Sequence, residues 1–181
     1  RRSEQLLGAF QRAHEAAMAD PSVLAQFRLA DWEPALLRDD PGFRTPSPHG
    51  RLDFFHVDET DALALTEDNA ATPAGAGFND LLTEAFAATP VMRAFRREFD
   101  IRPVPGRVGV VSVLLDAWRE FSGRWAGPRI AIVDWDDVPT WVEFEIFQRC
   151  FQSLGLETEI VDPRALVYRG GKLLAPGGPV D

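Results

Sequence analysis

The sequence predicts a mixed α/β fold in which helices, a β-hairpin and a strand–helix–strand unit follow one another along the chain. Three observations lead to this prediction. Apolar residues recur at helical spacing over residues 3–18. Two short apolar runs, 52–57 and 62–66, flank a polar turn, which is typical of a hairpin. Residues 129–161 read as a strand, an amphipathic helix and a second strand, the order of a βαβ crossover.

The N-terminal region is predicted to be helical. We expect Ser3 to cap the first helix, because serine is a preferred N-cap residue. Asp20 then caps a second, short helix that opens at Pro21. Residues 38–50 are rich in proline, glycine and aspartate, and this composition predicts a loop.

Beyond the hairpin, a loop rich in glycine, proline and alanine runs to Gly77. Helical spacing resumes over residues 78–86 and 90–99, and again over 108–121. A proline and glycine break at 103–106 separates the last two helices.

The last third of the chain carries the predicted βαβ unit. Residues 129–134 form a buried parallel strand, and an amphipathic helix runs from Thr140 to Gly155. Thr140 and Glu143 have the spacing of a capping box. After a strand at 157–161, residues 166–174 predict a second hairpin, and no closing element follows it. We therefore expect the chain to be a fragment of a longer polypeptide.

These elements suggest two domains. Residues 1–125 would hold the N-terminal helices and the first hairpin, and residues 126–181 would hold the βαβ unit, incomplete at its end. Both lengths are compatible with an ordinary small domain.

Composition and charge exclude several classes of function. The 181 residues carry a net charge of −9, and the pI is about 4.8. This charge argues against nucleic acid as the main partner and against a membrane surface. No secretion signal or membrane-spanning run is present, and Cys150 is the single cysteine, so we expect a cytoplasmic location. Cys150 falls in an amphipathic stretch and is interpreted as a small core residue.

Four polar residues of the hairpin form the main candidate site. Arg51 and Asp53 lie two apart on the first strand, and Glu67 and Asn69 lie two apart at the end of the second. Residues two apart on a strand share a face. If the hairpin pairs around residues 58–61, the partner of Asp53 is near 66–67, and all four side chains gather on one patch.

Two carboxylates and an amide oxygen are hard ligands of the kind that Mg²⁺ prefers, and a neighbouring arginine can neutralise a phosphoryl group. The alternative interpretation is a polar network without chemistry, because Arg–Asp pairs of this spacing are common at surfaces. Three scattered histidines show no metal-binding spacing and are interpreted as structural or surface residues: His14, His49 and His56.

The hairpin motif resembles a known family. Gly50-Arg51-Leu52-Asp53, followed by Glu67-x-Asn69-Ala70-x-Thr72-Pro73, is similar to the pattern of glutathionylspermidine synthetases, whose ATP-grasp fold is circularly permuted. The resemblance implies a helical region, a hairpin and a Rossmann-like pre-ATP-grasp unit, together an incomplete ATP-grasp fold. It departs at Ala71, where the family pattern has an acidic residue, and the Pro-Ala-Gly form resembles uncharacterised bacterial relatives.

The resemblance also implies roles for individual residues. Asp53, Glu67 and Asn69 would be Mg²⁺ ligands, and Arg51 would steady the transferred phosphoryl group as the catalytic residue. ATP contacts would come from three positions along the following loop: Asn69, Pro73 and Gly75. Mg²⁺ and ATP are thus the expected cofactors.

A second candidate site follows the predicted strand at 129–134. Asp134 and Trp135 lie at its carboxyl end, and Thr140 and Glu143 lie at the start of the next helix. Ligands favour this edge of a parallel sheet, and in the family this region binds substrate. The alternative is that Thr140 and Glu143 only cap the helix and Trp135 packs. A dinucleotide-binding domain ranks lower, because the turn at 134–140 contains no glycine.

The predicted function is therefore the N-terminal portion of an ATP-dependent carboxylate–amine, or carboxylate–thiol, ligase that works through an acyl phosphate. Its partners would be ATP and a small carboxylate, amine or peptide-like substrate, and a homo-oligomer is left open. The 181 residues alone are expected to be inactive, because Lys172 is the only lysine and the phosphate-gripping lysines of the family are missing. The alternative is a non-catalytic binding or scaffold domain with a related fold.

Overall fold

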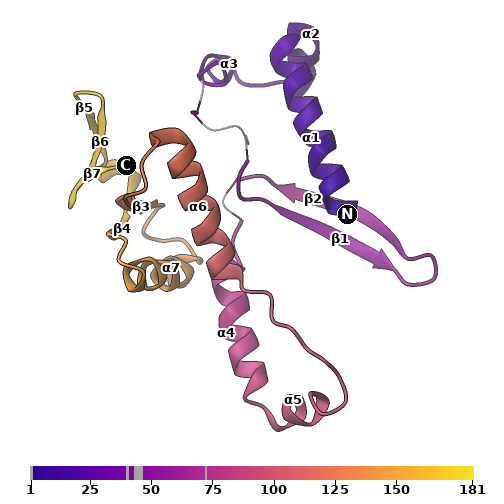
Figure 1. Cartoon of the computed structure of the whole chain (residues 1–181). Helices are drawn as coiled ribbons and strands as arrows, with labels where there is room; N and C mark the ends of the chain where they lie inside the picture. Colours follow the sequence, from indigo (N-terminus) through magenta and orange to yellow (C-terminus); the bar gives the residue numbers. More distant parts are fainter. Residues whose placement is uncertain (1, 40, 43–46, 72) are drawn as a thin grey trace. The chain divides into compact units, whose positions relative to one another are not determined.

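A computed structural model of the chain describes residues 2–39, 41–42, 47–71 and 73–181 (Figure 1). The fold is mixed α/β, as predicted. The chain divides into two compact units, Arg1–Ala70 and Ala71–Asp181.

The first unit consists of helices followed by a hairpin. Helix α1 occupies the region predicted to be helical, and an extra single turn, α3, was not predicted. The elements are α1 (Arg2–Ala19), α2 (Pro21–Leu24), a 3₁₀ turn (Ala25–Phe27), α3 (Glu33–Leu36), β1 (Arg51–Val57) and β2 (Ala62–Asn69). Asp20 caps α2 as predicted, since its Oδ1 accepts a hydrogen bond from Ser22 N at 2.8 Å. Ser3 lies inside the first turn of α1, which begins at Arg2, so the predicted cap at Ser3 is wrong.

The hairpin pairs in the register that the sequence predicts. Asp53 lies opposite Glu67, and Arg51 lies opposite Asn69. The register shifts between Asp53 and Phe54, where β2 carries one extra residue, Thr66. The Thr66 hydroxyl donates to the Asp53 carbonyl oxygen at 2.9 Å, and this bond closes the bulge.

The first unit has little closed core. Among its described apolar side chains only Ala17 is buried, at 6 % exposure. Leu7 of α1 is 50 % exposed and Phe55 of β1 is 71 % exposed. A helix and one two-stranded hairpin offer too few layers to enclose their apolar faces.

The second unit contains three longer helices and two small sheets. Its elements are α4 (Ala76–Ala87), α5 (Pro90–Phe95), α6 (Gly106–Ser122), β3 (Ile130–Val133), α7 (Trp141–Ser153), β4 (Thr158–Val161), a 3₁₀ turn (Pro163–Ala165), β5 (Val167–Arg169), β6 (Lys172–Ala175) and β7 (Gly178–Val180). Helix α5 ends four residues before the predicted helix does, and the other predicted helices and strands are present within a few residues of their expected bounds.

The core of this unit lies between α6, α7 and the βαβ strands. Val111, Phe151 and Leu156 are its buried members, and Ile130 and Cys150 pack against them. Cys150 is therefore the core residue that its position predicted. Strands β3 and β4 pair in parallel with Ile130 opposite Thr158, so the predicted βαβ unit is present.

One buried carboxylate joins α7 to the start of α4. Glu143 of α7 is only 3 % exposed. Its Oε1 accepts hydrogen bonds from the backbone N of Gly75 and of Gly77, both at 2.8 Å, and its Oε2 accepts from Gly75 N at 2.9 Å. These amides lie at the N-terminus of α4, where a helix has unpaired donors and a partial positive charge. Glu143 thus caps a helix other than its own.

The capping box predicted for α7 is wrong, because Glu143 bonds the start of α4 and not the start of its own helix. Thr140 is the N-cap residue of α7, yet its side chain makes no capping hydrogen bond. The carboxylate that would complete the box points to Gly75 and Gly77 instead. The spacing of a capping box does not distinguish a glutamate that bonds its own helix from one that bonds a neighbour.

A second acid repeats this arrangement between α4 and α6. Asp80 of α4 accepts from Gly106 N at 2.7 Å and from Arg107 N at 3.1 Å, at the N-terminus of α6. It also forms an ion pair with Arg107 at 3.0 Å. Burial pushes the pKa of Asp80 up, but the hydrogen bonds from Gly106 and Arg107 outweigh it and leave this pKa below its ordinary value.

The C-terminal strands form a three-stranded antiparallel sheet, β5-β6-β7. Its first two strands are the predicted second hairpin, with Arg169 opposite Lys172. The expectation that no closing element follows is wrong, because β7 pairs with β6 through Leu174 and Pro179. Proline is tolerated there because β7 is an edge strand.

The predicted domain boundary at residues 125/126 lies inside the second unit, between α6 and β3. Val111 of α6 packs with Phe151 of α7 and with Leu156, so α6 shares the core of the βαβ unit, and it also contacts α4 through Asp80. None of the helices in the described ranges combines the length and the apolar character needed to cross a membrane.

Replacing Glu143 with glutamine is expected to destabilise the second unit by roughly 3 kcal/mol, because a buried carboxylate loses its charge while its amide donors stay buried. The measurement is urea unfolding monitored by circular dichroism. Glu145→Gln, on the exposed side of the same helix, is the control and should change stability by less than about 0.5 kcal/mol. Equal effects of the two substitutions would contradict the role given to Glu143.

Candidate functional site

The hairpin brings together the four residues that the sequence singled out. In an antiparallel pair, residues directly opposite each other project from the same face. Arg51 opposite Asn69 and Asp53 opposite Glu67 therefore occupy one face of the strand ends. The predicted register is confirmed, and it places these four residues on one face of the hairpin.

Asp53 is the centre of this patch. Its Oδ1 accepts from Arg51 Nε at 2.8 Å, and its Oδ2 accepts from Arg51 Nη2 at 3.0 Å. Asn69 Nδ2 donates to the same Oδ2 at 3.4 Å. The paired geometry of guanidinium and carboxylate fixes both side chains, and it orients the Asn69 amide so that its oxygen is left for another donor or a cation.

The arginine also sets the ionisation of the patch. The hydrogen bond from Arg51 holds the pKa of Asp53 below its ordinary value of 3.8, and burial opposes this shift only in part. Asp53 is therefore a carboxylate throughout the physiological pH range.

Glu67 differs from Asp53 in having no partner. Its side chain is exposed and makes no hydrogen bond or ion pair with the described residues. Two acidic side chains directly opposite each other repel. Arg51 offsets the charge of Asp53, so the patch keeps the uncompensated charge of Glu67. Among the described residues, no three His, Cys, Asp or Glu side chains are grouped to hold a metal ion, so a cation here depends on Asn69 as well.

Of the predicted ATP-contacting residues, Asn69 ends β2 in the first unit, and Pro73 and Gly75 fall in the second; Thr72 lies outside the described residues. Pro73 precedes the left-handed residue Gly75, whose φ is 113°. The backbone N of Gly75 is bonded to Glu143. The Gly75 amide, which was predicted to contact the phosphates of ATP, therefore donates to a carboxylate of the protein instead. Sequence reasoning named Gly75 and Glu143 as parts of two different sites, and the structure brings them together.

The edge beyond β3 holds the remaining predicted residues. The backbone N of Trp135 donates to Asp134 Oδ1 at 2.8 Å, and the Trp135 ring is 49 % exposed. Thr140 starts α7, and Glu143 is turned away into the α4 contact. Asp134 and Trp135 therefore remain available at this edge, whereas Glu143 does not.

Two residues that sequence reasoning missed also lie at this edge. The guanidinium carbon of Arg164 lies 5.3 Å from the centre of the Trp135 ring, a cation–π contact. Asp162 accepts from Arg164 Nε at 2.8 Å, and this arginine lowers the pKa of Asp162 to about 2. The missed signal is that Asp162 follows a strand parallel to β3, so the two strand ends meet at one edge.

Two of the histidines, His56 and His14, lie outside these sites. His56 lies between two acids of the hairpin turn, with Nδ1 2.8 Å from Asp58 Oδ1 and Nε2 3.0 Å from Asp61 Oδ1. His56 and, secondarily, Arg2 hold the pKa of Asp61 below its ordinary value. His14 lines a cavity beside α1.

Comparisons of the chain with protein-family models, with curated proteins and with solved structures found no match. The likeness to circularly permuted ATP-grasp enzymes therefore stays a prediction from the motif residues.

Arg51→Gln should raise the pKa of Asp53 toward 3.8, measured by carbon NMR of the side-chain carboxyl. The sign for stability follows from linkage: a lowered pKa contributes stability above the unfolded value near pH ~3.9, and this contribution disappears as pH falls through the folded pKa. The variant should therefore lose part of the acid dependence of unfolding below pH ~5. Arg102→Gln, which removes a similar exposed pair with Asp100, should leave the titration of Asp53 unchanged.

Proposed function

We propose that the chain supplies the magnesium- and phosphate-binding part of an ATP-dependent ligase that joins a carboxylate to an amine or a thiol through an acyl phosphate. The observation that carries the proposal is the hairpin register, which aligns Asp53 with Glu67 and Arg51 with Asn69 at one end of the strands. This arrangement agrees with the roles that the family resemblance implies for the same residues. A cytoplasmic location is part of the same proposal.

The donor set fits Mg²⁺ in its chemistry. Glu67 offers an unpaired carboxylate, Asn69 offers its amide oxygen, and Asp53 is held ionised by Arg51. Mg²⁺ binds a few hard oxygen ligands from protein and completes its shell with phosphate and water. When bound, the ion would neutralise phosphate charge and orient ATP.

The protein side chains would do the remaining work. Arg51 is held rigidly by Asp53, so its positive charge is fixed near the strand ends before a phosphate arrives. Glu67 and Asn69, on the neighbouring strand, would hold the cation beside it. Within the second unit, the edge beyond β3 is a separate candidate site, where Trp135 and Arg164 form an exposed cation–π pair.

The second candidate function is a binding or scaffold domain without catalysis, and a specific observation favours it. Both oxygens of Asp53 already accept hydrogen bonds from Arg51, and the amides of Gly75 and Gly77 already donate to Glu143. In a purely structural polar network, acidic side chains and hydrogen-bond donors are paired with each other within the protein, as they are here. The two candidates differ in whether Glu67 binds a cation.

The deciding experiment is calorimetric titration of Mg²⁺–ATP into the 181-residue chain and into a longer natural polypeptide that contains it. We expect binding to the longer protein to weaken at least tenfold, about 1.4 kcal/mol, in Glu67→Gln and in Asp53→Asn. ATP turnover by the longer protein should also be lost, because these substitutions remove cation ligands.

Glu59→Gln is the matched control. Glu59 is an exposed acid in the turn of the hairpin, and it lies at the opposite end of the strands from Arg51 and Asn69. It should leave binding unchanged. Full binding and turnover in Glu67→Gln and Asp53→Asn would exclude the ligase proposal and favour the scaffold. A uniform loss in all three variants would indicate long-range charge rather than a site.

A further inference from the structure

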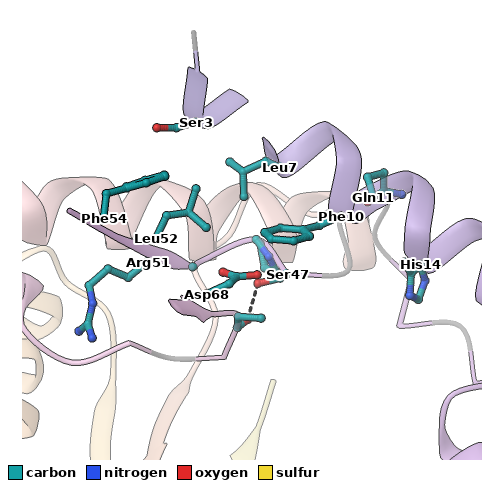
Figure 2. A pocket seen from close by; sticks show the side chains of 13 residues that line it. Ser3, Leu7, Phe10, Gln11, His14, Ser47, Arg51, Leu52, Phe54 and Asp68 are labelled. Atoms are coloured by element: carbon teal, nitrogen blue, oxygen red, sulfur yellow. Dashed lines mark hydrogen bonds between the residues drawn. The ribbon is translucent and has the colours of Figure 1, made fainter. Parts of the chain in front are cut away.

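An open cavity of about 650 Å³ lies in the first unit, between α1 and the hairpin. Its walls are the apolar side chains of Leu7 and Phe10 on α1 and of Leu52 and Phe54 on β1. Figure 2 shows Leu7 and Phe10 directed from the helix toward the strands, and Asp68 lines the same cavity. Cavities of this size and apolar character are typical of small-molecule sites.

The two walls follow from ordinary periodicity. Ser3, Leu7, Phe10 and His14 are spaced by four, three and four residues, which places them along one face of α1. On the hairpin, Leu52 lies directly opposite Asp68, so both project from one face. This is the face opposite to the one that carries Asp53 and Glu67.

The apolar walls are not covered by other side chains of the unit and stay partly exposed to solvent. Leu7 is half exposed, and apart from Ala17 no apolar side chain of the described part of this unit is buried. Apolar surface kept in water is unfavourable in free energy, and a ligand that covers it recovers that free energy. The body of a fitting ligand is therefore apolar.

The charge in the cavity is negative. Asp68 makes no hydrogen bond or ion pair with the described residues, and it is the acid of the lining. The basic residue of the lining, Arg51, is committed to Asp53, and Figure 2 shows its side chain directed away from Leu52 and Phe54. A cationic group is the complement of such a carboxylate. The remaining polar lining groups, Ser47 among them, are neutral donors and acceptors or His14.

We propose that this cavity binds a small amphipathic amine, with its apolar body between Phe10 and Leu52 and its ammonium group on Asp68. The site is separate from the cation patch on the other face of the hairpin. The inference does not rest on the ligase proposal, because it requires neither ATP nor Mg²⁺.

Three matched probes test the proposal on the whole 181-residue chain in the absence of ATP and Mg²⁺: phenethylamine, 2-phenylethanol and 3-phenylpropionate. Calorimetry at neutral pH should show the amine binding at least tenfold more tightly than the alcohol, and the carboxylate binding most weakly. Asp68→Asn should remove the preference for the amine and leave the affinity for the alcohol unchanged. Phe10→Ala should lower the affinity for the amine and for the alcohol by the same factor.

The controls separate the site from general effects. Glu59→Gln removes one negative charge from the same hairpin outside the cavity and should leave all three affinities unchanged. Thermal unfolding by circular dichroism identifies any variant that fails to fold. In ¹H–¹⁵N spectra, the amine should shift the amides of Leu7, Phe10 and Leu52. Equal binding of the amine and the alcohol, or an amine preference that survives Asp68→Asn, would overturn the proposal.

Discussion

The buried carboxylate of Glu143 is the contact on which the second unit depends. A carboxylate removed from water costs several kcal/mol unless its oxygens are hydrogen-bonded, and here the donors are the free amides at the start of α4. Asp80 of α4 then accepts from the start of α6 in the same way. Helices α7, α4 and α6 are thus linked in order by an acid of one helix and the N-terminus of the next. The apolar core of Val111 and Phe151 forms between the helices so positioned.

The hairpin of the first unit uses acids differently. Asp53 is only partly buried and is paired with one arginine on its own strand, and such a pair near the surface contributes little to stability while it orients both side chains. The bulge at Thr66 keeps Asp53 opposite Glu67 while the rest of β2 shifts by one residue. Oriented polar groups at a strand end that do not pack on an apolar core add little to the free energy of folding, and they are better suited to binding a ligand. This contrast between buried and exposed acids is why the hairpin, rather than the glycine loop, is the main candidate site.

Local patterns predicted the elements well, and they failed where a contact spans the sequence. Helical spacing identified α1, α6 and α7, and the polar turn at 58–61 determined the register that pairs Asp53 with Glu67. The partner of Glu143 lies 66 and 68 residues away, and no local rule points to it. Arg164 was missed in the same way, since only the parallel pairing of β3 and β4 brings it to Trp135. Strand β7 was missed because three residues containing a proline give no alternating pattern.

The close packing at Gly77 determines how sequence variation at this position among relatives of this chain should be interpreted. A β-carbon at this position would lie 3.0 Å from Glu143 Cγ and 3.3 Å from a ring carbon of Phe147. An invariant glycine here would therefore reflect the space that α7 leaves, even though it sits in a Pro-Ala-Gly-Ala-Gly segment that looks like a phosphate loop. Positions 77 and 143 should covary during evolution, with any larger residue at 77 accompanied by a shorter acid or a neutral side chain at 143. Position 67 is exposed at a strand end and carries no such steric linkage, so a change there would not require a matching change in α7.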